Sequence, residues 1–234
     1  MNCARFAESI ESKILTEAGG RIRRQTSSRR GSWQFRAVDA KSGLVLEAWL
    51  DSLVITRRSE ETAISPDTEG LLGGRYRGTL SRTGAYAARA RPFVPDEVAE
   101  VAGMASALDD MFPRLAPRAL HIGELWTDSL ELTVRRLADS VSSGTPLLRF
   151  ELRRRGESQA AASGHDSVPL EVQQKSDEVG QVVWHPGRGL LRSQRNVVVE
   201  TTVPPSRTVR QAVRSKVEQR LTLTRTSDAP VCRS

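Results

Sequence analysis

The chain has 234 residues, enough for one large domain or two small ones with a hydrophobic core. Apolar residues make up 38% of it, the mean hydropathy is -0.40, and no apolar run approaches the ~20 residues of a membrane-spanning helix, so we expect no transmembrane segment. The net charge of +7 comes mainly from arginines spread along the whole length, and only 5% of residues are aromatic, which disfavours a stacking surface for single-stranded nucleic acid.

The first twenty residues carry apolar side chains at a helical spacing. Phe6, Ile10 and Ile14 recur as one face of an amphipathic helix requires. We therefore expect residues 1–20 to form an N-terminal helix that ends at Gly19-Gly20. This opening lacks the basic start and apolar middle of a secretory signal, which predicts a cytoplasmic chain or one whose leader has been removed.

Residues 21–94 show the period-two alternation of β-strands and are predicted to form a first β half. The stretch "SWQFRAVD" places Trp33, Phe35 and Ala37 on one face, and "LVLEAWLDSLVITRR" alternates in the same way. The intervening Asp39–Gly43 is predicted to be a hairpin loop, because its glycine can adopt a positive φ. A further strand is expected at "RYRGTLS".

Residues 95–112 are expected to be a helical connection. Asp96 is a suitable N-cap, and Val98, Val101 and Leu108 fall on one helical face, so the spacing predicts a helix over Asp96–Met111. Pro113 should end it.

Residues 113–228 are predicted to form a second β half, followed by a tail at 229–234. In its first strand, Trp126, Leu130, Leu132 and Val134 should share one face. The last element, "TVRQAVRSKVEQRLTLTR", has apolar residues every four positions, which fits a helix or a strand; its β-branched composition favours a long strand. The fold class expected from these elements is mainly β (α+β), with two antiparallel twisted sheets or a half-barrel, an N-terminal helix and one mid-chain helix.

A short phrase occurs twice in the chain. "WLDSLVITRR" (49–58) and "LWTDSLELTVRR" (125–136) share Trp-x-Asp-Ser-Leu, an aliphatic residue, a Thr and an Arg pair. The echo indicates either a duplicated supersecondary unit or chance, and the first alternative would give two related β halves joined by the helix.

A wider resemblance covers residues 32–225. "MFPRLAPRALHIGELWTDSLEL", "LEAWLDSLVI", "GGRYRGTLSRTGAY" and "HPGRGLLRSQRNVVVE" resemble, in the same order, segments of a family of uncharacterised bacterial exported proteins and lipoproteins known as a domain of unknown function. Departures are Glu124, where the family usually has Asp, and Ala116 before Pro117, where Leu-Pro is more typical. The resemblance implies a β-rich, extracytoplasmic protein akin to the curved half-barrels that carry lipids or lipoproteins, with no assigned reaction.

Residues with catalytic or metal-binding chemistry do not form a recognisable pattern. The three histidines, His121, His165 and His185, lack the close spacing of a zinc site. The Asp-Ser pairs of the echo would point to opposite faces of a strand and so cannot act as a dyad. Cys3 and Cys232 are either two free thiols or a bridge between the ends of the chain. We therefore predict no catalytic residue, no metal site and no cofactor.

Aromatic and aliphatic side chains provide the candidate binding site. Ordinary core packing explains them, but they would also suit an apolar groove between a curved sheet and the mid-chain helix, able to take an acyl chain or a hydrophobic peptide. The groove residues of this hypothesis are Trp49, Trp126, Leu130, Phe150 and Trp184.

Two functions follow as hypotheses. The first is a non-enzymatic extracytoplasmic protein, in the periplasm or cell envelope, that binds or carries an apolar ligand or a protein partner of the envelope. The second is a basic interaction module that binds anionic surfaces or nucleic acid through the arginines of "RIRRQTSSRR" (21–30) and "ELRRRG" (151–156), with a steep loss of binding in salt. The scattered charge makes nucleic acid the less favoured partner. A hydrolase using His121 or His165 is a third, reserve hypothesis.

Overall fold

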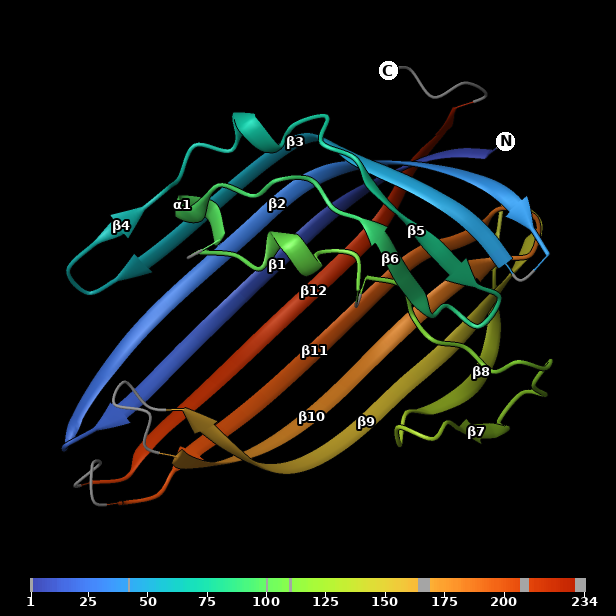
Figure 1. Cartoon of the computed structure of the whole chain (residues 1–234). Coiled ribbons are helices and arrows are strands. Elements are labelled where there is room, and N and C mark those ends of the chain that lie inside the picture. The colour runs from blue at the N-terminus through green and yellow to red at the C-terminus, as the bar shows by residue number, and fades with distance from the viewer. Residues whose placement is uncertain are drawn as a thin grey trace.

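A computed structural model describes residues 2–41, 43–99, 101–109, 111–163, 169–206 and 211–229. Twelve strands form a single antiparallel sheet (Figure 1). The strands are β1 (Asn2–Ala18), β2 (Arg21–Ala40), β3 (Gly43–Ser59), β4 (Ala63–Ile64), β5 (Tyr76–Ser81), β6 (Tyr86–Ala90), β7 (Leu125–Thr127), β8 (Thr133–Ser142), β9 (Thr145–Ser163), β10 (Pro169–His185), β11 (Gly189–Val203) and β12 (Val213–Ala229). Helical structure in the described part of the chain is confined to α1 (Asp96–Ala99) and the 3-10 turns η1 (Glu69–Leu71) and η2 (Met104–Ser106).

The strand order is β6-β5-β3-β2-β1-β12-β11-β10-β9-β8-β7, with β4 paired to β3. Strands that follow one another along the chain are therefore neighbours, except β4 and β5, which both pair with β3, and β6 and β7, which lie at opposite edges. The first and last strands pair at the middle of the sheet, with Cys3 opposite Ala229 and Ala18 opposite Val213. The chain also passes from β6 at one edge to β7 at the opposite edge, and we call this connection, residues 91–124, the crossover.

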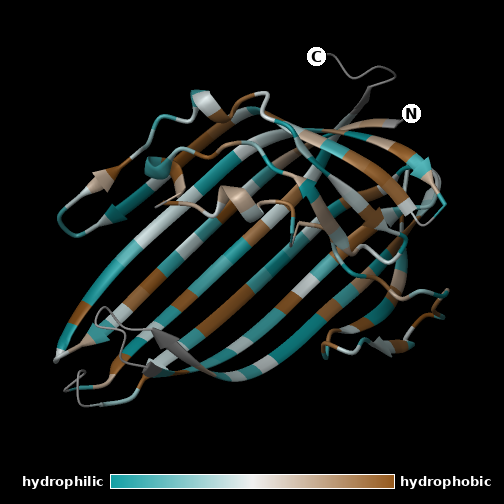
Figure 2. Cartoon of the chain, viewed as in Figure 1, coloured by the Kyte–Doolittle hydropathy of each residue, from teal (hydrophilic) through white to brown (hydrophobic). Residues whose placement is uncertain are grey.

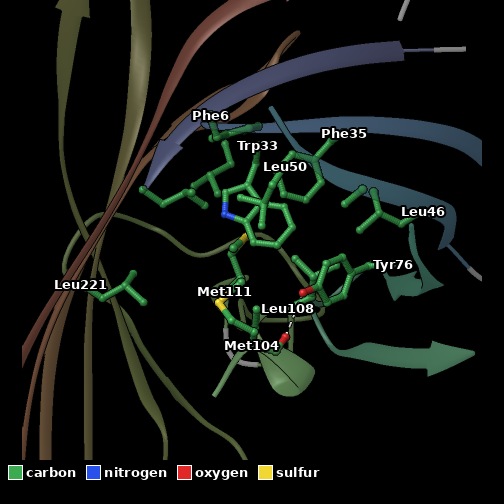
Figure 3. Packing of buried hydrophobic residues seen from close by; sticks show 14 of the residues in the cluster. Phe6, Trp33, Phe35, Leu46, Leu50, Tyr76, Met104, Leu108, Met111 and Leu221 are labelled. Atoms are coloured by element: carbon green, nitrogen blue, oxygen red, sulfur yellow. Dashed lines mark hydrogen bonds between the residues drawn. The ribbon is translucent and has the colours of Figure 1, made fainter. Parts of the chain in front are cut away.

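The crossover lies against one face of the sheet, which curves around it (Figure 1). We call this the inner face. Apolar and polar residues alternate along the long strands (Figure 2), as expected when each strand presents every second side chain to the core. Trp33 and Tyr76 from the sheet pack with Met104, Leu108 and Met111 from the crossover (Figure 3), and all five are at most 1% exposed.

The N-terminal segment is a strand, and the prediction of a helix there is wrong. Phe6, Ile10 and Ile14 are separated by four residues, an even number, so they also share one face of a strand. β1 pairs along its whole length with both β2 and β12, which satisfies its backbone on both sides. The same ambiguity at the other end of the chain was resolved correctly, because β12 is the long strand that its composition indicates.

The prediction of two sheets is also wrong, because the β1–β12 pair joins all the strands into one. Among the described residues of the expected helix Asp96–Met111, α-helix is confined to Asp96–Ala99. Gly103, with φ -73° and ψ 61°, leaves the helical region and precedes η2. Val98, Leu108 and Met111 are buried as their spacing indicates, but they reach the sheet from an irregular segment.

The two copies of the echoed phrase adopt different backbones. In β3, Asp51 is the extra residue where the register with β2 shifts between Ser32 and Trp33. In the second copy, Asp128 starts a tight turn between β7 and β8, and its Oδ1 accepts the backbone amides of Leu130 (2.8 Å) and Leu132 (2.9 Å). Trp126 therefore lies opposite Val134 in a hairpin, not on one strand with it.

None of the helices among the described residues has the length and apolar composition needed to cross a bilayer. Cys3 is buried and is not a free thiol. Its potential partner Cys232, and the His165-Asp166 pair, lie outside the described residues.

Candidate ligand-binding cavity

A cavity of about 950 Å³ lies at one end of the inner face, between the sheet and the crossover. This volume is near the upper end of the range for small-molecule sites. Its walls come from the start of β1, the β2–β3 hairpin, the end of β5, the crossover and the β10–β11 hairpin. The lining residues are Cys3, Ala4, Phe6, Phe35, Ala37, Asp39, Ala40, Gly43, Leu44, Leu46, Leu80, Ser81, Arg82, Gly84, Phe112, Pro113, Leu115, Trp184, Gly187, Arg188, Gly189, Leu190 and Arg225.

Aromatic rings form much of the apolar wall. The Phe6 and Phe35 rings meet edge to face with centroids 5.4 Å apart, and Phe35 makes a similar contact with Phe112 of the crossover at 5.6 Å. Edge-to-face contacts of this kind hold rings in defined positions. The wall is therefore built jointly by the sheet and the crossover.

A hydrogen bond and a close backbone contact fix the crossover beside the cavity. The Leu115 amide donates to the Thr83 carbonyl in the β5–β6 turn at 3.0 Å. Gly84 in the same turn has φ +87°, and a Cβ there would lie 2.1 Å from the Pro113 carbonyl oxygen. Only glycine allows this approach, so the sequence "RTG" of the turn determines where the crossover can sit.

Charged side chains gather at the mouth. Among the described residues, Arg82, Arg188 and Arg225 line it together with one acid, Asp39. The Arg225 guanidinium lies 5.8 Å from the centre of the Phe6 ring, and its Nη1 donates to the Arg188 carbonyl. Arg225 therefore stands at the boundary between the apolar wall and the polar mouth.

His185 shapes the β10–β11 turn at the same mouth. Its Nδ1 accepts the backbone amides of Gly187 (3.0 Å) and Arg188 (3.2 Å). A ring nitrogen that accepts two amides is occupied in holding the turn, so this histidine has a structural role.

Beyond the aromatic residues, the inner face carries two buried ionic clusters. Glu8 accepts from the Arg29 Nη2 at 2.7 Å and from the Trp33 indole at 3.2 Å. Glu178 accepts from Arg154 at 2.8 Å and from Arg195 at 3.4 Å. Each of these buried carboxylates therefore accepts hydrogen bonds from two side chains of the sheet.

Tyr76 lies next to the first cluster and donates its hydroxyl to the Met104 carbonyl at 3.0 Å. Burial raises the pKa of this phenol to about 12, because a phenolate would lose its hydration there. This hydrogen bond attaches η2 of the crossover to β5 of the sheet.

The opposite, outer face has a second hollow of about 830 Å³ over β9, β10 and β11. Charged side chains border it, and they pair with one another: Arg155 with Asp177 (3.5 Å) and Lys175 with Glu157 (3.2 Å). Exposed ion pairs do not form an apolar site, so the inner cavity is the better candidate.

The sequence-predicted groove residues lie in several places. Trp184 lines the cavity. Trp126 and Phe150 pack against the inner-face core but do not line the cavity, and Leu130 is 53% exposed in the β7–β8 turn. Trp49 is buried on the outer face, where the Arg75 guanidinium lies 3.8 Å from the centre of its ring.

Sequence reasoning missed two groups of cavity residues. Phe112 and Leu115 belong to the crossover, whose path across the sheet no local pattern indicates. Arg82 and Arg188 sit in hairpin turns, where polar residues are normally interpreted as solvent-exposed. The signal that could have found them is their common type, since both turns carry an arginine within two residues of a glycine.

Other candidate residues have structural contacts. Asp51 accepts both of its hydrogen bonds from the Gln34 amide nitrogen at 2.7 Å and lies 3.8 Å from Arg5. His121 is exposed, and its backbone amide donates to Glu124. Among the described residues, no group of three or more His, Cys, Asp or Glu side chains is placed to hold a metal ion.

Comparisons with known proteins add one finding at the level of fold. No protein-family model matches the chain, and no curated protein matches it. The chain is similar to a solved structure of lipovitellin, described by its lipid-protein interactions, with a TM-score of 0.54 and 9% sequence identity. The similarity covers 100% of this chain and 26% of that one, so the shared feature is the fold of a quarter of a longer protein.

Proposed function

We propose that this protein is a non-enzymatic binding or carrier protein that holds the hydrocarbon part of a ligand in the inner-face cavity. The observation that carries the proposal is the cavity itself: about 950 Å³ of space bounded by Phe6, Phe35, Phe112 and aliphatic side chains. Displacing water from such a surface is favourable by roughly 25 cal/mol per Å² of apolar area. A hydrocarbon chain is the ligand chemistry that gains most from it.

Two further points support the proposal. The fold is shared with a region of lipovitellin, a protein whose structure is described by lipid-protein interactions. The resemblance to exported bacterial proteins agrees with a role in the periplasm or cell envelope, and we include that location in the proposal. Both points are similarities to other proteins, whereas the cavity is observed in this chain itself.

The arginine clusters give less support to the alternative, a basic module for anionic surfaces or nucleic acid. Successive residues of a strand point to opposite faces, so each cluster is divided between the two sides of the sheet. Many of the arginines also face carboxylates: Arg29 faces Glu8, and Arg154 faces Glu178. Charge that is already paired contributes little to binding a polyanion.

Binding of a neutral pyrene-labelled long-chain alcohol tests the proposal, because it has the hydrocarbon chain without a charge. Ala37 lines the cavity on β2, and the next residue, Val38, is 44% exposed on the outer face. We expect Ala37→Phe to fill part of the cavity and weaken probe binding about tenfold or more, or ~1.4 kcal/mol. Val38→Phe adds an aromatic ring to the same strand and should leave binding unchanged.

Fluorescence titration of the pyrene probe measures both variants, and urea unfolding checks that both remain folded. No saturable binding by the unmodified protein would overturn the proposal. Equal affinity in Ala37→Phe and Val38→Phe would show that the probe binds elsewhere.

A further inference from the structure

The mouth of the cavity has an excess of positive charge directly beside its apolar wall. Its described lining residues include three arginines, Arg82, Arg188 and Arg225, and one carboxylate, that of Asp39. Arg82 and Arg188 lie in hairpin turns, whereas Asp39 and Arg225 lie on the strands β2 and β12.

Arg82 is available to a ligand. It is exposed at the tip of the β5–β6 turn, and within the described part of the chain its guanidinium makes no ion pair or hydrogen bond. By contrast, the exposed Arg77 on the preceding strand, β5, has Glu47 as a partner at 2.9 Å.

Arg225 is placed at the junction between the two environments. It is half-buried, its guanidinium faces the Phe6 ring, and one nitrogen donates to the Arg188 carbonyl. A cation partly removed from water interacts more strongly with an anion than an exposed one does. The planar guanidinium also offers parallel N–H groups that match a carboxylate or a phosphate.

We propose that the ligand is an anionic amphiphile, whose hydrocarbon chain occupies the cavity and whose acidic head lies among Arg82, Arg188 and Arg225. This inference rests on the proposed function and adds the chemistry of the head to it. The shared chemistry is an oxyanion on a long chain, and both a fatty-acid carboxylate and a lysolipid phosphate have it.

Ligands with the same chain and different heads test the inference. Tetradecanoic acid, tetradecan-1-ol and myristoyl lysophosphatidic acid are titrated against the full chain by displacement of the pyrene alcohol, below their micelle concentrations. We expect the acid to bind about tenfold more tightly than the alcohol, and the preference to shrink at high salt because exposed charges are screened. The ligand that binds more tightly, the carboxylate or the phosphate, identifies whether the natural ligand is a fatty acid or a lysolipid.

Charge variants locate the head. Arg82→Gln and Arg225→Gln should each reduce the preference for the acid, taken as the ratio of acid affinity to alcohol affinity on the same variant, about threefold to tenfold. Arg89→Gln is the matched control, because Arg89 is an exposed arginine on β6 that does not line the cavity. Arg82 makes no contact that folding depends on, so Arg82→Gln stays informative if the loss of Arg225 weakens the fold.

The outcomes separate the two proposals. If the alcohol binds as tightly as the acid, the anionic head is wrong and the apolar site stands. If Arg89→Gln lowers the preference as much as Arg82→Gln, the effect comes from net charge and the placement of the head is wrong. If neither the alcohol nor the acids bind, the proposed function itself fails.

Discussion

Single buried polar groups connect the sheet to the crossover, and Tyr76 is the clearest case. Its ring packs 5.3 Å from that of Trp33, and its hydroxyl donates to the Met104 carbonyl at 3.0 Å. A phenolate could not donate this bond and would lose its hydration on burial. For these two reasons the folded state requires the protonated form of Tyr76.

Stability should therefore depend on pH in the alkaline range. The folded pKa of Tyr76, about 12, is above the ordinary value of 10.0, so the unfolded chain loses this proton first. The contribution of Tyr76 is complete below pH 10 and is lost as the pH rises from 10 through 12. We expect the free energy of unfolding, measured with urea, to fall over this interval. Tyr76→Phe should cost about 1 kcal/mol at neutral pH and should remove the part of the alkaline fall that comes from Tyr76.

The two tyrosines of the chain make the titration direct. The increase in absorbance at 295 nm when phenols ionise reports Tyr76 and Tyr86, above a constant tryptophan background, and the pKa of Tyr86 is also raised by burial. The difference between the unmodified protein and Tyr76→Phe isolates the buried phenol. Ionisation of Tyr76 near pH 10 in the folded protein would contradict the packing described for it.

At the scale of elements, the β5–β6 turn positions the crossover, and Gly84 is the residue that permits it. Gly84→Ala should destabilise the protein for two reasons, the positive φ of +87° and the Pro113 carbonyl oxygen 2.1 Å from the new Cβ. Gly123 has nearly the same φ, +86°, with no atom within 4 Å of a Cβ. Gly123→Ala therefore measures the conformational cost alone, about 1 kcal/mol.

We expect Gly84→Ala to cost roughly 2 kcal/mol more than this control, because a backbone atom must move to admit the methyl group. It should also weaken binding of the pyrene alcohol, since the Thr83–Leu115 hydrogen bond holds one wall of the cavity. Urea unfolding and fluorescence titration measure the two effects. Equal costs for the two alanine variants would mean that the turn and the crossover are not in contact.

The elements also show where sequence patterns decide structure and where they do not. Alternation correctly placed Trp33 and Phe35 on one face of a strand, and both are buried there. A spacing of four in β1 allowed both a helix and a strand, and only the partners β2 and β12 resolve it. The echoed Trp-x-Asp-Ser-Leu forms a bulged strand once and a tight turn once, so a five-residue match does not determine a backbone.

At the scale of the whole molecule, the sequence predicted strands but not their order. Period two reports that one face of a strand is buried, and it carries no information on which strand lies beside it. The pairing of β1 with β12 and the path of the crossover are therefore properties of the assembled chain. The cavity depends on both, and Phe112 and Leu115 line it from the crossover, whose path no sequence pattern indicates.

This topology should also control how fast the protein folds. A circular permutant tests this. Its two original ends are joined by a short Gly/Ser linker, and the crossover is opened between Pro117 and Arg118, which are both exposed. The new chain runs from β7 to β12 and then from β1 to β6, so that its strands form one continuous meander. The β1–β12 pair, which now joins Ala18 to Val213, then becomes a local hairpin. Because long-range pairing slows folding, we expect this permutant to refold about tenfold faster.

A second permutant with the same linker provides the control. Here the exposed β8–β9 turn is opened between Ser143 and Gly144. The linker again makes the β1–β12 pair local, but β8 and β9 now lie at opposite ends of the new chain, so their pairing becomes long-range. Its refolding rate should stay near that of the unmodified protein, because one long-range pairing has replaced another. Stopped-flow refolding after brief unfolding, which keeps the prolines in their native isomers, measures the rates. Equal refolding rates for the two permutants would show that pairing the strands farthest apart in the sequence is not the slow step of folding.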